Sequence, residues 1–274
     1  MSYAMVMVHV DVDATADARI RLAAGLADRF AADLIGASAC LLPSYPAEGA
    51  YFVTRGVVEQ ERRDIETLLV RAEAAFRAAA GVDRGRIEWR AAIELPDTYL
   101  AAQARAADLV IVGRASGPLD VARAPDPGSI ALRAGRPVLV VPPGVAALAG
   151  ERVIVGWKDT REARRALRDA LPFLTRAATV ALVEICDEPS VSKGRQHLED
   201  VAGYLARHKV KVGAKIATHP EGRVADELVR LAKADNADLI VAGAYGHSRL
   251  GEWVLGGATR DLLAASPVCC LFAH

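Results

Sequence analysis

The stretch ADLIVAG, residues 237–243, decides the fold of this chain. It is a short, continuous run of Ala, Leu, Ile and Val, interrupted by one Asp, that ends on a glycine. Runs of this kind are typical of strands that are buried on both faces of a parallel sheet. A nearly identical stretch, ADLVIVG, stands at residues 107–113, which indicates that the same strand is built twice.

The repeat extends well beyond these two strands. Residues 136–141, RPVLVV, match residues 266–271, SPVCCL, at the same offset of 130 residues that separates 107 from 237. The beginnings match as well, since residues 8–11, VHVD, resemble residues 155–158, VGWK. A repeat of this length is too long for a solenoid unit and has the size of a domain.

We therefore expect two tandem α/β domains, at residues 1–144 and 151–274, with the Pro- and Gly-rich segment 142–151 as their linker. We refer to them as the first half and the second half. Each half predicts an open, doubly wound sheet of five parallel strands with helices on both faces. Ligands bind such sheets beyond the carboxyl ends of the strands, where the strand order reverses.

Short apolar runs and helical periodicity locate the expected elements. In the first half we expect strands at about 4–11, 33–40, 86–93, 108–113 and 137–141, and helices at about 15–31, 56–80, 96–106 and 128–134. In the second half we expect strands at about 152–157, 178–186, 210–218, 238–243 and 267–272, and helices at about 160–176, 191–208, 222–235 and 257–265.

Composition argues against several classes of function. Lys and Arg number 34, as do Asp and Glu, and a net charge of zero argues against broad binding to nucleic acid or to an acidic membrane. No apolar run approaches the ~20 residues that span a bilayer, and the first residues lack the pattern of a signal peptide. The four cysteines form no metal-binding or C-x-x-C pattern and are expected to be buried in a reducing compartment, so we expect a cytoplasmic protein.

A glycine-containing loop follows the strand at 237–243. Gly243, Gly246 and Gly256 are spaced as G-x2-G-x9-G, and Gly257 opens a predicted helix. Glycines let a ligand approach the backbone, and the first amides of a helix favour an anion. Thr259 could add a hydroxyl contact or a cap. The loop is therefore either a phosphate-binding loop or a tight turn whose glycines serve packing.

With this loop between ADLIVAG and the later residues TRDLL and SPV, the chain resembles the universal stress protein family. The resemblance covers the whole chain, because both halves carry the same frame, and it implies a tandem universal stress protein. In that family the glycine motif, usually followed by Ser or Thr, holds the phosphates and ribose of ATP. An Asp at the end of the first strand helps to hold the adenosine end. Some members bind no nucleotide and act through dimerisation and partner contacts.

The second half departs from the family pattern at two positions. Gly257 stands where Ser or Thr is usual, so a hydroxyl is lost while the backbone amide is kept. Lys158 stands where the Asp is usual, with Asp159 beside it. A Lys cannot accept hydrogen bonds as a carboxylate does, although it could attract a phosphate.

The first half departs in the opposite way. Asp11 stands at the end of its first strand, with Asp13 as the competing alignment. The ungapped repeat places Ser116 opposite Gly246, Asp126 opposite Gly256 and Pro127 opposite Gly257. An Asp repels phosphate and a Pro has no amide N–H to donate, so we expect the first half to be a structural repeat without a nucleotide site.

The candidate nucleotide site is therefore in the second half. His247 and Arg249 could reach a phosphate and Trp157 could line an adenine pocket, although a solvated His and a packing Trp are the alternatives. The predicted site comprises Gly243, Gly246, His247, Arg249, Gly256, Gly257, Ala258, Thr259, Trp157 and Lys158.

Three functions are consistent with the sequence. The first is a stress-response protein that binds ATP, with or without Mg²⁺, as a regulatory ligand. The second is an interaction scaffold without nucleotide, assembled as a homodimer or as a pseudo-dimer of its two halves. The third, a slow ATP hydrolase, is weakened because no set of nucleophile, base and orienting group and no metal-ligand spacing stands out.

Overall fold

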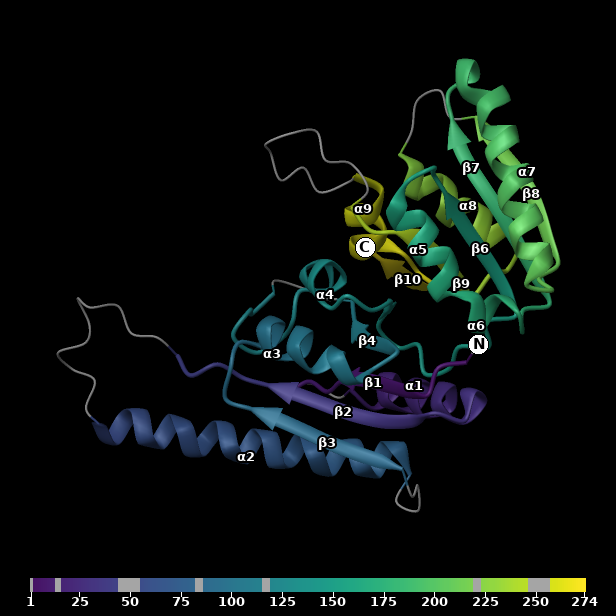
Figure 1. Cartoon of the computed structure of the whole chain (residues 1–274). Helices are drawn as coiled ribbons and strands as arrows, with labels where there is room; N and C mark the ends of the chain where they lie inside the picture. The colour runs from purple at the N-terminus through teal and green to yellow at the C-terminus, as the bar shows by residue number, and fades with distance from the viewer. Residues whose placement is uncertain are drawn as a thin grey trace, which may run out of the picture.

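The computed structural model describes residues 2–12, 16–43, 55–81, 86–114, 119–218, 223–245 and 257–274 (Figure 1). The first half contains β1 (Met5–His9), α1 (Asp17–Phe30), β2 (Asp33–Ala39), α2 (Arg55–Ala80), β3 (Ile87–Ala92), α3 (Pro96–Gln103), a 3₁₀ turn (Ala104–Ala106), β4 (Leu109–Gly113), α4 (Pro127–Arg133) and β5 (Val138–Val141).

The second half repeats this order of strands and main helices. It contains β6 (Arg152–Trp157), α5 (Arg161–Asp169), α6 (Leu171–Leu174), β7 (Thr179–Cys186), a 3₁₀ turn (Glu188–Ser190), α7 (Val191–Arg207), β8 (Val212–Thr218), α8 (Val224–Ala234), β9 (Leu239–Gly243), α9 (Gly257–Ala265) and β10 (Cys269–Ala273). Every predicted strand and helix has a counterpart, so apolar patterning locates the elements of both halves.

One predicted helix, at 160–176, is wrong as a single element. The structure divides it into α5 and α6, which meet at Ala170. Pro172 lies in the first turn of α6. Proline has no amide N–H and its ring crowds the preceding turn, so a helix can restart at this position but cannot run through it unchanged.

The strands form a single ten-stranded sheet in the order β3-β2-β1-β4-β5-β10-β9-β6-β7-β8. The pairings within each half are parallel, as predicted. The two five-stranded sheets are joined edge to edge, because β5 and β10 pair antiparallel with Cys270 opposite Val140. The two repeats are thus related across this central pair of strands (Figure 1).

The repeated Asp of the ADL motif has a structural role in both halves. Asp108 accepts hydrogen bonds from the backbone N–H groups of Ala4 and Met5, at 2.8 and 3.1 Å. Asp238 accepts from the N–H groups of Gly150 and Arg152, at 2.7 and 3.4 Å. Each carboxylate therefore fixes the start of the first strand beside its own strand.

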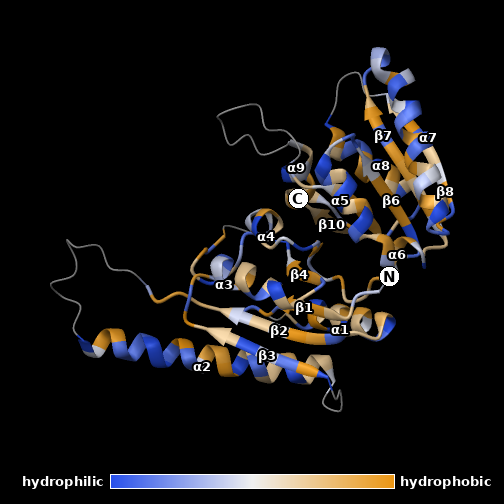
Figure 2. Ribbon diagram, viewed as in Figure 1, coloured by the Kyte–Doolittle hydropathy of each residue, from blue (hydrophilic) through white to orange (hydrophobic). Residues whose placement is uncertain are grey.

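Helices cover both faces of the sheet. One face packs against α1, α2, α5 and α7, and the other packs against α3, α4, α8 and α9. Figure 2 shows hydrophobic residues along strands such as β6 and β7, as expected for strands covered on both faces. Cys40, Cys269 and Cys270 are buried, as predicted, whereas Cys186 is only partly buried. Cys269 and Cys270 point to opposite faces of the sheet. Among the described helices, none is long and apolar enough to cross a membrane.

An aromatic cluster adds a second contact between the halves. The ring of Phe30 packs edge-to-face against Tyr3 and Phe173, with centroids 4.9 and 5.1 Å apart. The Tyr3 hydroxyl donates to the backbone oxygen of Asp169, at 2.6 Å. The amino-terminal end of the chain therefore lies beside α6 in the second half (Figure 1).

Candidate functional site

The strand order of the second half reverses between β6 and β9. Strand β6 lies between β7 and β9, while β9 continues toward β10. Trp157 and Gly243 are the last residues of β6 and β9, so both stand at the edge where this fold class binds ligands.

A cavity of about 300 Å³ opens at this edge. Six residues of the predicted site line it, namely Trp157, Lys158, Gly243, Gly257, Ala258 and Thr259. Gly246, His247, Arg249 and Gly256, the other four predicted residues, lie outside the described residues. The structure therefore brings together every predicted site residue that it describes.

The cavity also has apolar walls that the sequence analysis missed. Val183 and Ile185 of β7 line one part, and Val224 and Leu228 of α8 line another. Strand β7 pairs with β6, so the carboxyl end of β7 lies at the same edge of the sheet as the end of β6. The contribution of α8 depends on how that helix packs across the sheet, which no short motif encodes.

Gly243 is a glycine for a packing reason. A Cβ at this position would lie 2.6 Å from the backbone nitrogen of Ala163 and 2.8 Å from the carbonyl carbon of Glu162. Real Cβ atoms do not approach backbone atoms so closely, so only glycine lets the start of α5 pack on the end of β9. This glycine would be needed whether or not a ligand binds.

Thr259 links the start of α9 to the end of β9. It is buried, and its hydroxyl lies 3.4 Å from the Gly243 carbonyl oxygen and 3.2 Å from the Tyr245 backbone nitrogen. The hydroxyl donates to the carbonyl and accepts from the amide. Tyr245 has a φ of +59°, an uncommon conformation for a residue with a side chain, and the Thr259 contact helps to hold it there.

Gly257 and Lys158 are the two exposed residues of this set. A Cβ on Gly257 would meet no atom within 4 Å, so this position could carry a side chain without a clash. Lys158 is exposed just beyond β6, next to the cap of α5, where the Thr160 hydroxyl accepts from the Ala163 backbone N–H at 3.2 Å. The rim of the cavity therefore offers one cation and the first turn of a helix.

Trp157 lies beneath the surface. Its side chain is 6% exposed, and within the described residues its indole nitrogen has no hydrogen-bond partner. Trp157 lines the cavity at the strand ends and also a second cavity between α5 and α7. It is the one predicted site residue shared by both.

The equivalent place in the first half is filled by charged side chains. Arg19 of α1 forms an ion pair with Asp11 and donates from Nε to the His9 carbonyl oxygen at 3.0 Å. Its guanidinium lies directly over Gly113, where a Cβ would collide with it. Burial lowers the pKa of His9 to about 4, although the nearby Asp11 favours the charged form, so this imidazole is neutral at pH 7.

The start of α4 is also satisfied within the protein. The Asp126 carboxylate accepts from the backbone N–H groups of Gly128 and Ser129, at 3.3 and 2.9 Å. This carboxylate caps the helix where an anionic ligand would otherwise bind the amides. The hydroxyl of Tyr245, from the second half, lies beside Gly128 at this capped end of α4. Burial, together with the charge of Asp126, raises the pKa of Tyr245 to about 12.

Metal ligands are not grouped in the part of the chain that the structure describes. No group of three or more His, Cys, Asp or Glu side chains there could hold a metal ion. Burial raises the pKa of Cys269 and of Cys270 to about 12, so both thiols are protonated at neutral pH.

Comparison with known proteins gives a family for the second half. Residues 150–274 match the Universal stress protein family. Among solved structures, a universal stress protein from Archaeoglobus fulgidus DSM 4304 superimposes with a TM-score of 0.73 at 12% sequence identity, over 98% of this chain and 95% of that chain. A functionally unknown protein from Pseudomonas aeruginosa PAO1 superimposes with a TM-score of 0.59 at 16% identity, over 99% of this chain and 92% of that chain.

No curated protein matches the sequence. The family match is therefore confined to residues 150–274, the second half of the chain. At identities this low, the structural matches establish the fold of the whole chain and no more.

Proposed function

We propose that this chain is a tandem universal stress protein whose second half binds an adenine nucleotide, ATP, as a regulatory ligand. One observation carries the proposal. The second half has a cavity where its strand order reverses, lined by the predicted loop and strand-end residues, whereas Arg19 fills the same place in the first half. The proposal concerns a stress-response protein of the cytoplasm, in keeping with four cysteines that form no disulfide, three of which are buried.

The phosphates would bind at the start of α9. This helix has nine residues, and Gly257, Ala258 and Thr259 form its first turn at the cavity wall. The first amide groups of a helix point outward with a partial positive charge, which favours a phosphate. Lys158, which also lines the cavity, adds a cation. Bound Mg²⁺ would screen the remaining phosphate charge.

The adenosine end would lie against the apolar walls. Val183, Ile185 and Leu228 present hydrocarbon to the cavity, and Trp157 also lines it. Such walls suit a flat, weakly polar ring. With Lys158 in place of a carboxylate, the ribose hydroxyls lose one acceptor. We therefore expect ATP to bind here mainly through its phosphates and base.

The first test is direct. Protein purified from cells is denatured and the released nucleotide is identified by chromatography, and stripped protein is then melted with and without millimolar ATP. Release of adenine nucleotide, or a rise in melting temperature with ATP, supports the proposal. If no adenine nucleotide is released and ATP does not raise the melting temperature, the proposal is contradicted.

A matched pair of variants at Gly257 locates the site. Because a Cβ there meets open space, both Gly257→Asp and Gly257→Ser should fold normally. The Asp variant should lose ATP binding by charge repulsion, while the Ser variant, which restores the usual hydroxyl, should bind more tightly. Equal affinity in wild type and both variants would mean that ATP binds elsewhere.

A second function, an interaction scaffold without nucleotide, is favoured by two observations. Lys158 replaces the carboxylate of the family pattern, and the Thr259 hydroxyl is already engaged by Gly243 and Tyr245. In that case the ten-stranded sheet, with the halves joined at β5 and β10, is the functional unit. The scaffold predicts that ATP leaves the melting temperature unchanged in wild type and in Gly257→Ser alike.

A further inference from the structure

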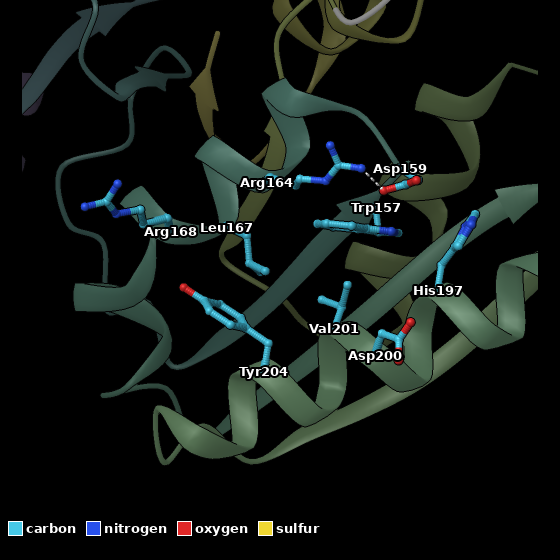
Figure 3. Close-up of a pocket in the computed structure, with 9 residues that line it drawn as sticks. All are labelled: Trp157, Asp159, Arg164, Leu167, Arg168, His197, Asp200, Val201 and Tyr204. Carbon is cyan, nitrogen blue, oxygen red and sulfur yellow. Dashed lines mark hydrogen bonds and ion pairs between the residues drawn. The ribbon is translucent and has the colours of Figure 1, made fainter.

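A second cavity lies on one face of the second half, between α5 and α7. Its volume is about 450 Å³, within the roughly 300–1,000 Å³ of small-molecule sites. Figure 3 shows the indole of Trp157 across its centre, with Leu167 and Tyr204 on one side and His197 on the other. We call this cavity the α5–α7 groove.

The groove exists because two helices stay apart. In the first half α1 packs directly against α2, whereas among the described residues no comparable contact joins α5 to α7. The floor also differs, since Val10 stands where the second half has Trp157. Val10 is 1% exposed under its helices, while Trp157 borders open space. The groove is thus present in the second half, whereas the equivalent place in the first half is closed by the packing of α1 against α2.

The floor of the groove carries an unsatisfied donor. Trp157 is only 6% exposed, and its indole nitrogen lacks a hydrogen-bond partner in the described part of the chain. A buried N–H without a partner destabilises the protein, and most such groups in native structures are paired. In Figure 3 the indole nitrogen lies on the side of the groove near Asp159 and His197. The nitrogen itself is buried, and an acceptor that reaches it from this side of the groove would satisfy the N–H.

The walls select a flat and largely apolar body. Leu167 and Val201 are buried beside the indole, and Tyr204 presents its ring at the entrance with 37% of its surface exposed. Aromatic rings favour stacked or edge-to-face contacts with other rings. Trp157 and Tyr204 therefore offer two aromatic surfaces to one ligand.

The charges at the rim balance. Two arginines, Arg164 and Arg168, face two aspartates, Asp159 and Asp200, and Arg164 is ion-paired with Asp159. His197 is held from below, because its Nδ1 lies 3.3 Å from both carboxylate oxygens of the buried Glu184. A rim without net charge gives no preference for an anion or a cation.

From these features we propose that the α5–α7 groove is a binding site for an uncharged, planar aromatic molecule that accepts a hydrogen bond from the Trp157 indole N–H. The ligand is of bicyclic size and carries a ring nitrogen or carbonyl as its acceptor. The site is separate from the cavity at the strand ends and does not depend on nucleotide binding. Because Trp157 lines both cavities, a ligand in the groove also contacts the wall of the other one.

The test uses two probes of similar size on the full chain. Isoquinoline offers a ring-nitrogen acceptor, whereas indole offers a donor in its place. Nuclear magnetic resonance follows the indole N–H signals, of which the three tryptophans give three, and Trp157→Phe assigns the relevant one. Isoquinoline should move the Trp157 N–H proton signal downfield and bind about tenfold more tightly than indole, the effect of one hydrogen bond that relieves a buried donor.

Two variants separate binding in the groove from binding at another place on the chain. Trp157→Phe keeps an aromatic floor but removes the N–H, so this variant should bind isoquinoline and indole with about equal affinity. Tyr204→Ala, at an exposed position, should weaken both probes while leaving the fold intact. Gly257→Asp should leave isoquinoline binding unchanged, even if it abolishes ATP binding.

Three results would overturn the inference. These are the absence of a Trp157 signal shift at saturating isoquinoline, equal affinity for the two probes in wild type, or an unchanged preference in Trp157→Phe. Loss of isoquinoline binding in Gly257→Asp would likewise overturn it, because the probe would then occupy the strand-end cavity.

Discussion

In the first half, Arg19 covers the carboxyl ends of β1 and β4, whereas in the second half the ends of β6 and β9 border a cavity of about 300 Å³. The strand order is the same in both halves. A few side chains on a common frame therefore decide whether the point of strand reversal borders a cavity or is filled by the protein. This separates fold from function within one chain.

The same contrast applies to the two helices that follow β4 and β9 in the chain. Asp126 caps α4 with its own carboxylate, while α9 begins with a glycine that has open space around it. The first half satisfies its charges internally, and the second half leaves room for an external anion. Substitutions at matched positions of the two halves test whether this difference holds.

Removal of Arg19 should cost the most stability. Arg19→Ala leaves the Asp11 carboxylate without its ion-pair partner in a place where the two side chains are only 12% and 25% exposed. A largely buried charge that loses its partner costs about 3 kcal/mol. Urea unfolding of the wild type and the variant measures the difference.

The matched control lies at the corresponding end of the second half. Arg164 pairs with Asp159, but these side chains are 59% and 42% exposed. Arg164→Ala should therefore cost less than about 1 kcal/mol, because water and salt screen exposed pairs. An equal loss in both variants would show that Arg19 does not fill a buried site.

His9 should make the stability of the protein pH-dependent. Burial lowers the pKa of this imidazole to about 4, against Asp11 which favours the charged form. In the unfolded chain His9 binds a proton near pH 6.5, whereas in the folded chain it stays neutral down to about pH 4. The free energy of unfolding therefore falls by about 2 kcal/mol between pH 8 and pH 5. Denaturant titrations at the two pH values measure this fall.

His9→Gln is the control for this titration. Glutamine is neutral at every pH, so the variant should lose most of the difference in stability between pH 8 and pH 5, whatever its absolute stability. The second half has Gly156 at this position and contributes no such titration. A pH dependence that is the same in wild type and variant would rule out His9 as its source.

Gly243→Ala should destabilise the second half by packing alone. Its Cβ would meet backbone atoms at 2.6 and 2.8 Å, which cannot move without shifting α5. Overpacking of this kind costs about 2 kcal/mol. Gly257→Ala, where a Cβ meets nothing within 4 Å, should change stability by less than about 0.5 kcal/mol. Thermal melts of the two variants test the difference, and equal melting temperatures would contradict it.

Asp126→Ala should destabilise the protein less than Arg19→Ala or Gly243→Ala. It removes the cap that accepts from Gly128 and Ser129, and loss of a helix cap costs about 1 kcal/mol. Asp126→Asn keeps a capping oxygen and should retain most of that stability. If chemical unfolding gives the same midpoint for wild type and Asp126→Ala, the cap is not what stabilises α4.

Much of the fold could be predicted from the sequence, because burial on both faces of a parallel sheet leaves continuous apolar runs such as residues 108–113 and 238–243. The junction between β5 and β10 could not. An apolar strand such as Val138–Val141 has the same pattern whether its edge pairs with another part of the chain or with a different molecule. The break at Pro172 could have been predicted, because proline interrupts helices, but the sequence analysis expected one helix over residues 160–176.

The candidate site could be predicted in part. Glycine spacing and strand ends pointed to Gly243, Gly257 and Thr259, which the structure brings to one cavity. The sequence left open whether Gly243 serves packing, and its packing partner could not be predicted, because that partner is the backbone of a helix 80 residues earlier in the chain, at Ala163. Arg19 was missed for the same kind of reason, since no spacing rule says that a helix side chain will fold back over Gly113.

The proposed difference in ligand binding between the two halves is tested most directly by calorimetric titration of stripped, full-length protein with ATP. Because one strand-end cavity is open and its counterpart is filled, we predict a stoichiometry of one ATP per chain, lost in Gly257→Asp and retained in Asp126→Asn. A stoichiometry of two per chain, or no binding at millimolar ATP, would contradict it.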